Sequence, residues 1–148
     1  MLVYIDEYLT IQFDKEKSEM TIDWRKASAR LLNKNIARRF MLIAEAIKKY
    51  RPKYVLSNFE DMVYSHIWGV ENLFYHNIHS VMLNAGVEKF AYIKSKDKIT
   101  EVLFDQLLYN SELKKVKIKN FKSSADAEKW LMKGKSYNKF AGNLAISA

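Results

Sequence analysis

The sequence contains no cysteine, one proline and four glycines among 148 residues. Without cysteine the chain can form no disulfide, no thiolate nucleophile and no cysteine-ligated zinc or iron–sulfur site. So little proline and glycine excludes a collagen-like or loop-dominated fold. An apolar core must therefore hold the chain together, and hydrophobic residues make up 49% of it, enough to build such a core at this length.

Long apolar runs are also missing. The longest internal run, Phe40–Ala44, is far shorter than the about 20 residues that a membrane span needs. The apolar start Met1–Ile5 ends at Asp6 and has no basic region before it, unlike a signal peptide. We therefore expect a cytoplasmic protein with no transmembrane segment.

Basic residues are absent from one stretch and crowded elsewhere. The formal net charge is +8, yet residues 54–88 contain no lysine or arginine. Residues 25–53 and 89–148 hold almost all of the positive charge. Basic blocks of this kind can mark an anionic partner, or they can be the solvated surface of helices and a strand. Both interpretations stay open at this point.

Alternating apolar and polar residues predict a hairpin near the start of the chain. The alternation runs over residues 9–13 and again over 20–24, as in half-buried strands. The polar segment Asp14–Ser18 between them suits a turn. We expect Met1–Ile5 to extend the first of these strands.

Four helices and three further strands follow in alternation. Apolar residues three or four apart predict helices, and short apolar runs predict strands. The helices are expected at about 29–50, 69–85, 98–110 and 123–134, and the strands at 54–56, 90–93 and 114–121. This order predicts an α/β fold whose mixed sheet has an antiparallel N-terminal hairpin, then parallel strands, with four helices packed on it. A single domain over 1–133 and a basic, flexible tail over 134–148 are expected.

Four segments, taken in order, carry a family resemblance. They are Thr21–Trp24, Arg51–Leu56, Asn84–Ala91 and a closing segment with Phe121, Trp130 and Leu131. Over roughly residues 1–133 the chain thereby resembles the SpoIIAA-like proteins of the STAS domain family. The resemblance implies a small α/β sandwich that binds or signals without enzymatic activity.

Some STAS domains are phosphorylated on a serine at the start of the helix after a central strand. Their motif there is Asp-Ser-x-Gly. In this chain Ser57 follows the corresponding strand, but it is followed by Asn58 and Phe59, and the motif is absent. The sequence therefore does not predict phosphorylation.

The segment Ser57–Trp68 is the strongest candidate for a binding surface. It is aromatic, it lies in the stretch without basic residues, and it follows a predicted parallel strand. Ligands of such sheets bind beyond the carboxyl ends of the strands, and exposed aromatic residues favour protein interfaces. The candidate binding residues are Ser57, Asn58, Asp61, Tyr64, His66 and Trp68.

In this interpretation Tyr64 and Trp68 supply contact area, while Asn58 and Asp61 supply polar specificity. The partner would be another protein, a second copy of the chain forming a homodimer, or a small apolar ligand. In the alternative interpretation, this loop is a lid that folds back on the core.

A rival hypothesis uses the basic residues. Rows of positive charge can neutralise phosphates. The candidate anion-binding residues are Arg30, Lys34 and Arg38 on the first helix, and Lys115, Lys117 and Lys119 on the last strand. No helix-turn-helix, aromatic RNA-binding motif or KH glycine loop accompanies them, so nucleic acid is the less favoured partner.

The sequence does not predict catalysis or a cofactor. It has no G-x-S-x-G motif and no glycine-rich phosphate loop. Three histidines, His66, His76 and His79, lie close together, but their spacing matches no metal-binding motif. We expect no enzymatic activity, no cofactor and no metal.

Overall fold

The computed structural model describes residues 1–30, 33–63, 78–109 and 115–134. The strands are β1 (Leu2–Ile5), β2 (Leu9–Asp14), β3 (Glu19–Trp24), β4 (Tyr54–Asn58), β5 (Lys89–Ile93) and β6 (Lys117–Phe121). The helices in these ranges are the short 3-10 helix η1 (Lys26–Arg30) and the α-helices α1 (Asn33–Tyr50), α3 (Ser80–Ala85), α4 (Lys98–Tyr109) and α5 (Ser124–Met132). The predicted α/β class is confirmed.

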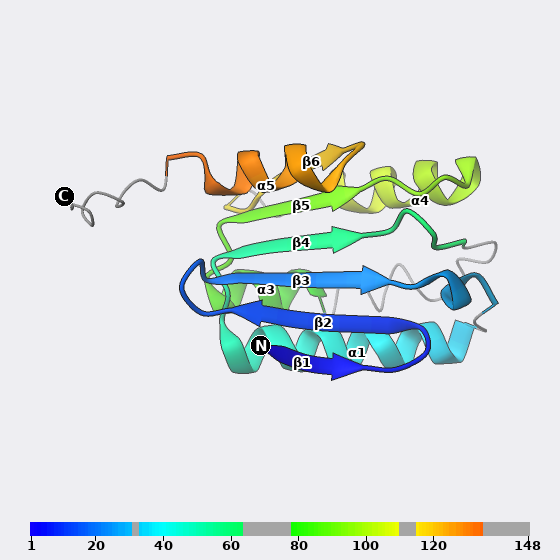
Figure 1. The fold of residues 1–148 in the computed structure, drawn as a ribbon, viewed down its shortest axis with the longest axis horizontal. Helices are drawn as coiled ribbons and strands as arrows, with labels where there is room; N and C mark the ends of the chain where they lie inside the picture. Colours follow the sequence, from blue (N-terminus) through cyan, green and yellow to red (C-terminus); the bar gives the residue numbers. More distant parts are fainter. Residues whose placement is uncertain (31–32, 64–77, 110–114, 135–148) are drawn as a thin grey trace.

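The strands lie side by side in sequence order in one sheet (Figure 1). β1, β2 and β3 are antiparallel, and β3 to β6 are parallel. The predicted antiparallel start and parallel continuation are therefore confirmed. Because each parallel strand is the next neighbour of the one before it, right-handed connections place the intervening helices on the same face of the sheet.

The first strand was the main error of the prediction. Residues 2–5 do not extend β2 but form a separate edge strand antiparallel to it. Asp6 reverses the chain, because its carboxylate accepts hydrogen bonds from the backbone amides of Tyr8 and Leu9 at 2.7 and 2.8 Å. An aspartate that binds nearby amides in this way is a common turn former.

The helix boundaries follow from local signals. α1 begins at Asn33, later than expected, because η1 occupies Lys26–Arg30. Gly86 ends α3 with a φ of 85°, a conformation in which glycine is least strained. Ser123 begins α5, since its side chain accepts a hydrogen bond from the backbone amide of Asp126. Of the predicted helix 69–85, the part before Ile78 lies outside the described residues.

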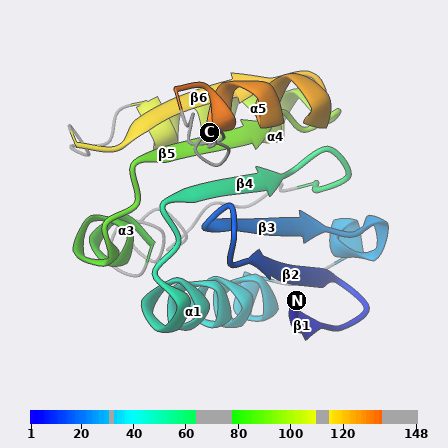
Figure 2. The ribbon, with the colours of Figure 1, turned by 60° about the vertical axis from the view of Figure 1, so that its left-hand side comes forward.

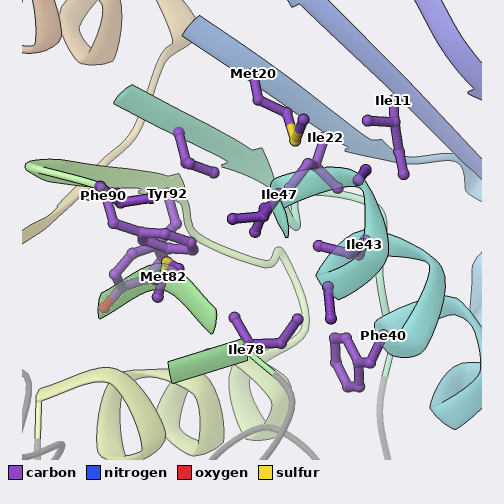
Figure 3. Packing of buried hydrophobic residues seen from close by; sticks show 14 of the residues in the cluster. Ile11, Met20, Ile22, Phe40, Ile43, Ile47, Ile78, Met82, Phe90 and Tyr92 are labelled. Carbon is purple, nitrogen blue, oxygen red and sulfur yellow. The ribbon is translucent and has the colours of Figure 1, made fainter. Parts of the chain in front are cut away.

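One face of the sheet is covered by α1, α3 and α4, and we call it the three-helix face. Isoleucines of α1 pack there against side chains of β2 and β3, and Met82 of α3 packs near Phe90 and Tyr92 (Figure 3). Phe59, just after β4, stacks on Phe104 of α4 with ring centroids 4.3 Å apart. This face holds the main core.

Of the helices in the described ranges, only α5 covers the other face, and we call it the one-helix face. Ala127 and Leu131 of α5 pack on β4 and β5, where they bury Leu56 and Ala91. Figure 2 shows α5 at the β5–β6 end of the sheet, away from α1. Over β2 and β3 this face carries polar side chains such as Gln12, which is exposed.

Among the described helices, none has the length and apolar character that crossing a membrane would require.

Candidate functional site

The loops that follow β4 and β5 lie next to each other at the carboxyl ends of the parallel strands, on the right of Figure 1. Asn58 at the end of β4 is in register with Ile93 at the end of β5. The backbone amide of Phe59 donates to the carbonyl oxygen of Ile93 at 3.1 Å. We call the segments Asn58–Val63 and Lys94–Val102 together the carboxyl-end surface.

Hydrogen bonds fix the two loops to each other. The backbone amide of Lys96 donates to the carbonyl oxygen of Glu60 at 3.0 Å. The hydroxyl of Ser95, a buried residue, donates to the carbonyl oxygen of Met62 at 2.6 Å and accepts from the amide of Asp97 at 3.0 Å. These segments are far apart in the sequence, and the bonds make one surface of them.

Charged side chains cross the same junction. The ammonium of Lys96 lies 3.5 Å from Oδ1 of Asp61 and 3.8 Å from Oε2 of Glu60. The Lys96 side chain is 68% exposed, so these ion pairs contribute little to stability. The ammonium and the two carboxylates place both positive and negative charge on this surface, where a partner can contact them.

Asp97 sets the start of α4. Its carboxylate accepts hydrogen bonds from the hydroxyl of Thr100 at 2.7 Å and from the backbone amide of Thr100 at 3.0 Å. The hydroxyl bond is the larger cause, and together they lower the pKa of Asp97. The carboxylate thus stays ionised and caps the helix.

Apolar side chains are exposed in the same two segments. Val63 is 40% exposed, Ile99 65% and Val102 45%. Exposed apolar groups beside charged ones are typical of surfaces that bind proteins.

Of the predicted binding residues, Asn58 and Asp61 lie on this surface. Oδ1 of Asn58 accepts a hydrogen bond from the backbone amide of Glu60 at 2.9 Å, so the side chain also shapes the loop. Asp61 is half-buried beside Lys96. Tyr64, His66 and Trp68 lie outside the described residues.

The structure places Ser57 away from this surface. Ser57 is in register with Ile22 on the three-helix face and is 3% exposed. It lines an apolar space of about 10 Å³ together with Trp24, Phe40 and other core residues. Its hydroxyl therefore does not reach the carboxyl-end surface. Lys96 and Ser95, which sequence reasoning missed, do contribute to it.

The two halves of the rival anion site are separated. Arg38 is exposed on α1, which lies at the β1–β3 end of the sheet (Figure 2). Lys115, Lys117 and Lys119 are exposed on and beside β6, the opposite edge strand. The structure places Arg30 in η1 and Lys34 in α1, and does not describe their side chains. Arg38 and the three lysines on and beside β6 therefore do not form one surface.

Lysines do gather around the end of α5. The ammonium of Lys89 donates to the carbonyl oxygens of Trp130 and Lys133 at 2.8 and 3.1 Å, and it lies 5.2 Å from the centre of the Trp130 ring. Lys117 is the register neighbour of Lys89 on β6. Partial burial, then the charges of Lys117 and Lys133, lower the pKa of Lys89. We call Lys89, Lys117, Lys119 and Lys133 the lysine cluster.

His79 is buried, and burial lowers its pKa to about 4. It is therefore neutral at neutral pH. His66 and His76 lie outside the described residues. Within the described ranges, no three histidine or acidic side chains are grouped so that they could hold a metal ion.

Comparison with known proteins gives no relative from which a function could be carried over: no family model, curated protein or solved structure matches the chain.

Proposed function

We propose that the protein is a non-enzymatic binding module of the kind that the SpoIIAA-like resemblance implies, and that it contacts a partner protein through the carboxyl-end surface. One observation carries the proposal. Val63, Ile99 and Val102 are exposed in the two segments that the Ser95–Met62 hydrogen bond joins. A second copy of the chain is one form that the partner can take.

The geometry favours a protein over a small apolar ligand. The apolar space beside Ser57 has a volume of about 10 Å³, which is about the room that one water molecule needs. The exposed apolar groups lie instead on the outside of the molecule, in the same two segments as the charges of Lys96 and Asp61. Apolar side chains with charged neighbours match the core and rim of protein interfaces.

The hydrogen bonds between the loops also favour this role. Binding costs free energy when loops must be ordered, so a surface that is already fixed loses less on association. The bonds from Ser95 and Lys96 hold the segment Asn58–Val63 in place before any partner arrives.

Site-specific photo-crosslinking tests the proposal. A photoreactive phenylalanine replaces Ile99 in one variant and Leu83, which is 41% exposed on α3, in a control variant. We expect the probe at 99 to form a discrete adduct with a partner, or with a second copy, and the probe at 83 to form none. Equal labelling from both positions, or no adduct from position 99, would contradict the proposal.

The lysine cluster supports anion binding as a second candidate function. Lys89, Lys117 and Lys133 lie close enough for their charges to act on one another, with the Trp130 ring beside Lys89. Lysine ammonium groups placed in this way can neutralise phosphates, and an aromatic ring beside them can stack on a base.

A salt titration of binding to a labelled single-stranded oligonucleotide tests this second candidate. We expect affinity to fall steeply with salt, and Lys117→Ala to weaken binding. Arg38→Ala is the matched control, because Arg38 belongs to α1, which lies at the other end of the sheet (Figure 2). Absence of binding at low salt would remove this function.

A further inference from the structure

Two glutamates from distant parts of the chain meet on the one-helix face. Glu19 is the first residue of β3 and is in register with Tyr54 of β4, so its side chain lies on the face that α5 covers. Glu128 belongs to α5, and the carboxyl groups of Glu19 and Glu128 line one groove, close enough to act on each other. Glu19 is 4% exposed.

Charges of both signs lie near the pair. The ammonium of Lys17, from the β2–β3 turn, lies 3.6 Å from Oε1 of Glu128, and the Lys17 side chain is 50% exposed. Asp14 is the cross-strand neighbour of Glu19 and adds negative charge. The groove beside the pair, of about 1090 Å³, is also lined by Lys15 and Glu16 of the turn and by Lys49 of α1.

Two carboxylate oxygens of the pair are inaccessible to solvent. Oε2 of Glu19 and Oε1 of Glu128 are buried from solvent and accept no hydrogen bond. Two carboxylates in such a position cannot both be charged without strong repulsion. The ammonium of Lys17 lies 3.6 Å from Oε1 of Glu128 and offsets part of this repulsion, and a proton held between the two carboxyl groups removes the rest.

Burial and the hydrogen bond with Glu128 raise the pKa of Glu19 to about 8. In the unfolded or opened chain a glutamate titrates near 4.5. The closed state therefore holds a proton that the opened state loses. The stabilisation of the closed state by this proton is fully present below pH 4.5. It decreases as the pH rises from 4.5 to about 8.

We propose that a proton shared by Glu19 and Glu128 holds α5 on the sheet, and that losing this proton as the pH rises releases the helix. Release uncovers apolar side chains of β4 and β5, among them Leu56 and Ala91. This pH-sensitive contact is independent of the carboxyl-end surface, which lies at the opposite ends of the strands.

Hydrogen exchange of the backbone amides of α5 tests the proposal. Exchange is measured at pH 6 and pH 8 and corrected for the intrinsic effect of pH. The opening equilibrium of α5 should rise at least about tenfold between these values, while amides of β2 change much less.

Three variants separate this effect from general loss of structure. Glu19→Gln and Glu128→Gln each keep the size of the side chain and remove one charge, so α5 should become insensitive to pH in both. Glu16→Gln, in the adjacent turn, is the matched control and should behave like the unchanged protein. The proposal is wrong if α5 of the unchanged protein opens equally at both pH values, or if both glutamine variants keep the full pH dependence.

Discussion

The two faces of the sheet differ in how they are covered, although the same strands form both. On the three-helix face, α1, α3 and α4 bury apolar side chains from β2 to β5 in one continuous core. On the one-helix face, a small apolar cluster lies under α5, and the side chains over β2 and β3 are polar. Stability is therefore concentrated on one face, and the other is free to carry charge.

Strand β3 shows how the sequence produces this difference. Met20, Ile22 and Trp24 alternate with Thr21 and Asp23, and side chains in a strand point to opposite faces in turn. The apolar side chains of β3 lie on the same face as α1, and the polar side chains lie on the opposite face. Glu19 is one of these polar residues but is buried, and Glu128 of α5 lies against it.

Phe40→Ala should have the largest effect, because Phe40 lies in the main core. Phe40 is 1% exposed and its ring packs edge-on against Trp24, with centroids 5.5 Å apart. Removing the ring leaves a cavity and should lower the free energy of unfolding by about 3–5 kcal/mol. Urea denaturation measures it. A loss below about 1 kcal/mol would contradict the assignment of the main core to this face.

Leu131→Ala makes the corresponding change on the one-helix face. Leu131 is fully buried, but its cluster is small and lies under one helix. We expect a loss of about 2–3 kcal/mol, at the low end for a buried leucine. The same urea experiment compares the two variants. If Leu131→Ala cost more than Phe40→Ala, the proposed difference between the faces would be reversed.

Asp6→Asn tests the link between the first turn and α1. Burial alone would raise the pKa of Asp6, but hydrogen bonds from the Tyr4 hydroxyl, from backbone amides and from Arg39 outweigh it and lower the pKa. Arg39 is 2.8 Å from the Asp6 carboxylate. The stabilisation that the ionised Asp6 carboxylate provides is fully present above the ordinary pKa of 3.8. It is lost as the pH falls through the lowered pKa of the folded protein.

The variant should therefore lose about 1–2 kcal/mol at pH 7 and much less at pH 2.5. Denaturation at both pH values checks this. An equal loss at pH 7 and pH 2.5 would show that the charge of Asp6 is not the cause.

Lys117→Ala should have the smallest effect on stability. Lys117 is exposed on the edge strand β6 and faces other lysines. We expect a change within about 0.5 kcal/mol of the unchanged protein, and thermal unfolding measures it. A large loss would mean that the lysine cluster holds α5 in place in addition to presenting positive charge.

Much of the fold could be predicted from local patterns. The alternation over 9–13 and 20–24 identified β2 and β3, and the helical spacing identified α1 and α4. β1 was missed as a separate strand, because the turn depends on which amides the Asp6 carboxylate binds. Burial of Ser57 could have been predicted, since it lies two residues after the buried Val55 and so on the same face of β4.

The candidate site was predicted in part. Asn58 and Asp61 were expected because loops after parallel strands meet at one edge of a sheet. Ser95 and Lys96 were not expected, since their contacts join loops that are distant in the sequence. The Glu19–Glu128 pair escaped prediction for the same reason: neither residue has an unusual local pattern.

Native mass spectrometry of the protein isolated from cells that express it tests the central claim, that the carboxyl-end surface binds a protein. The unchanged chain is compared with Ile99→Asp, which places a charge on an exposed position of α4. We expect the unchanged chain to carry the added mass of a partner or a second copy, and the variant to be a bare monomer. A bare monomer in both samples, or the same complex in both, would contradict the account.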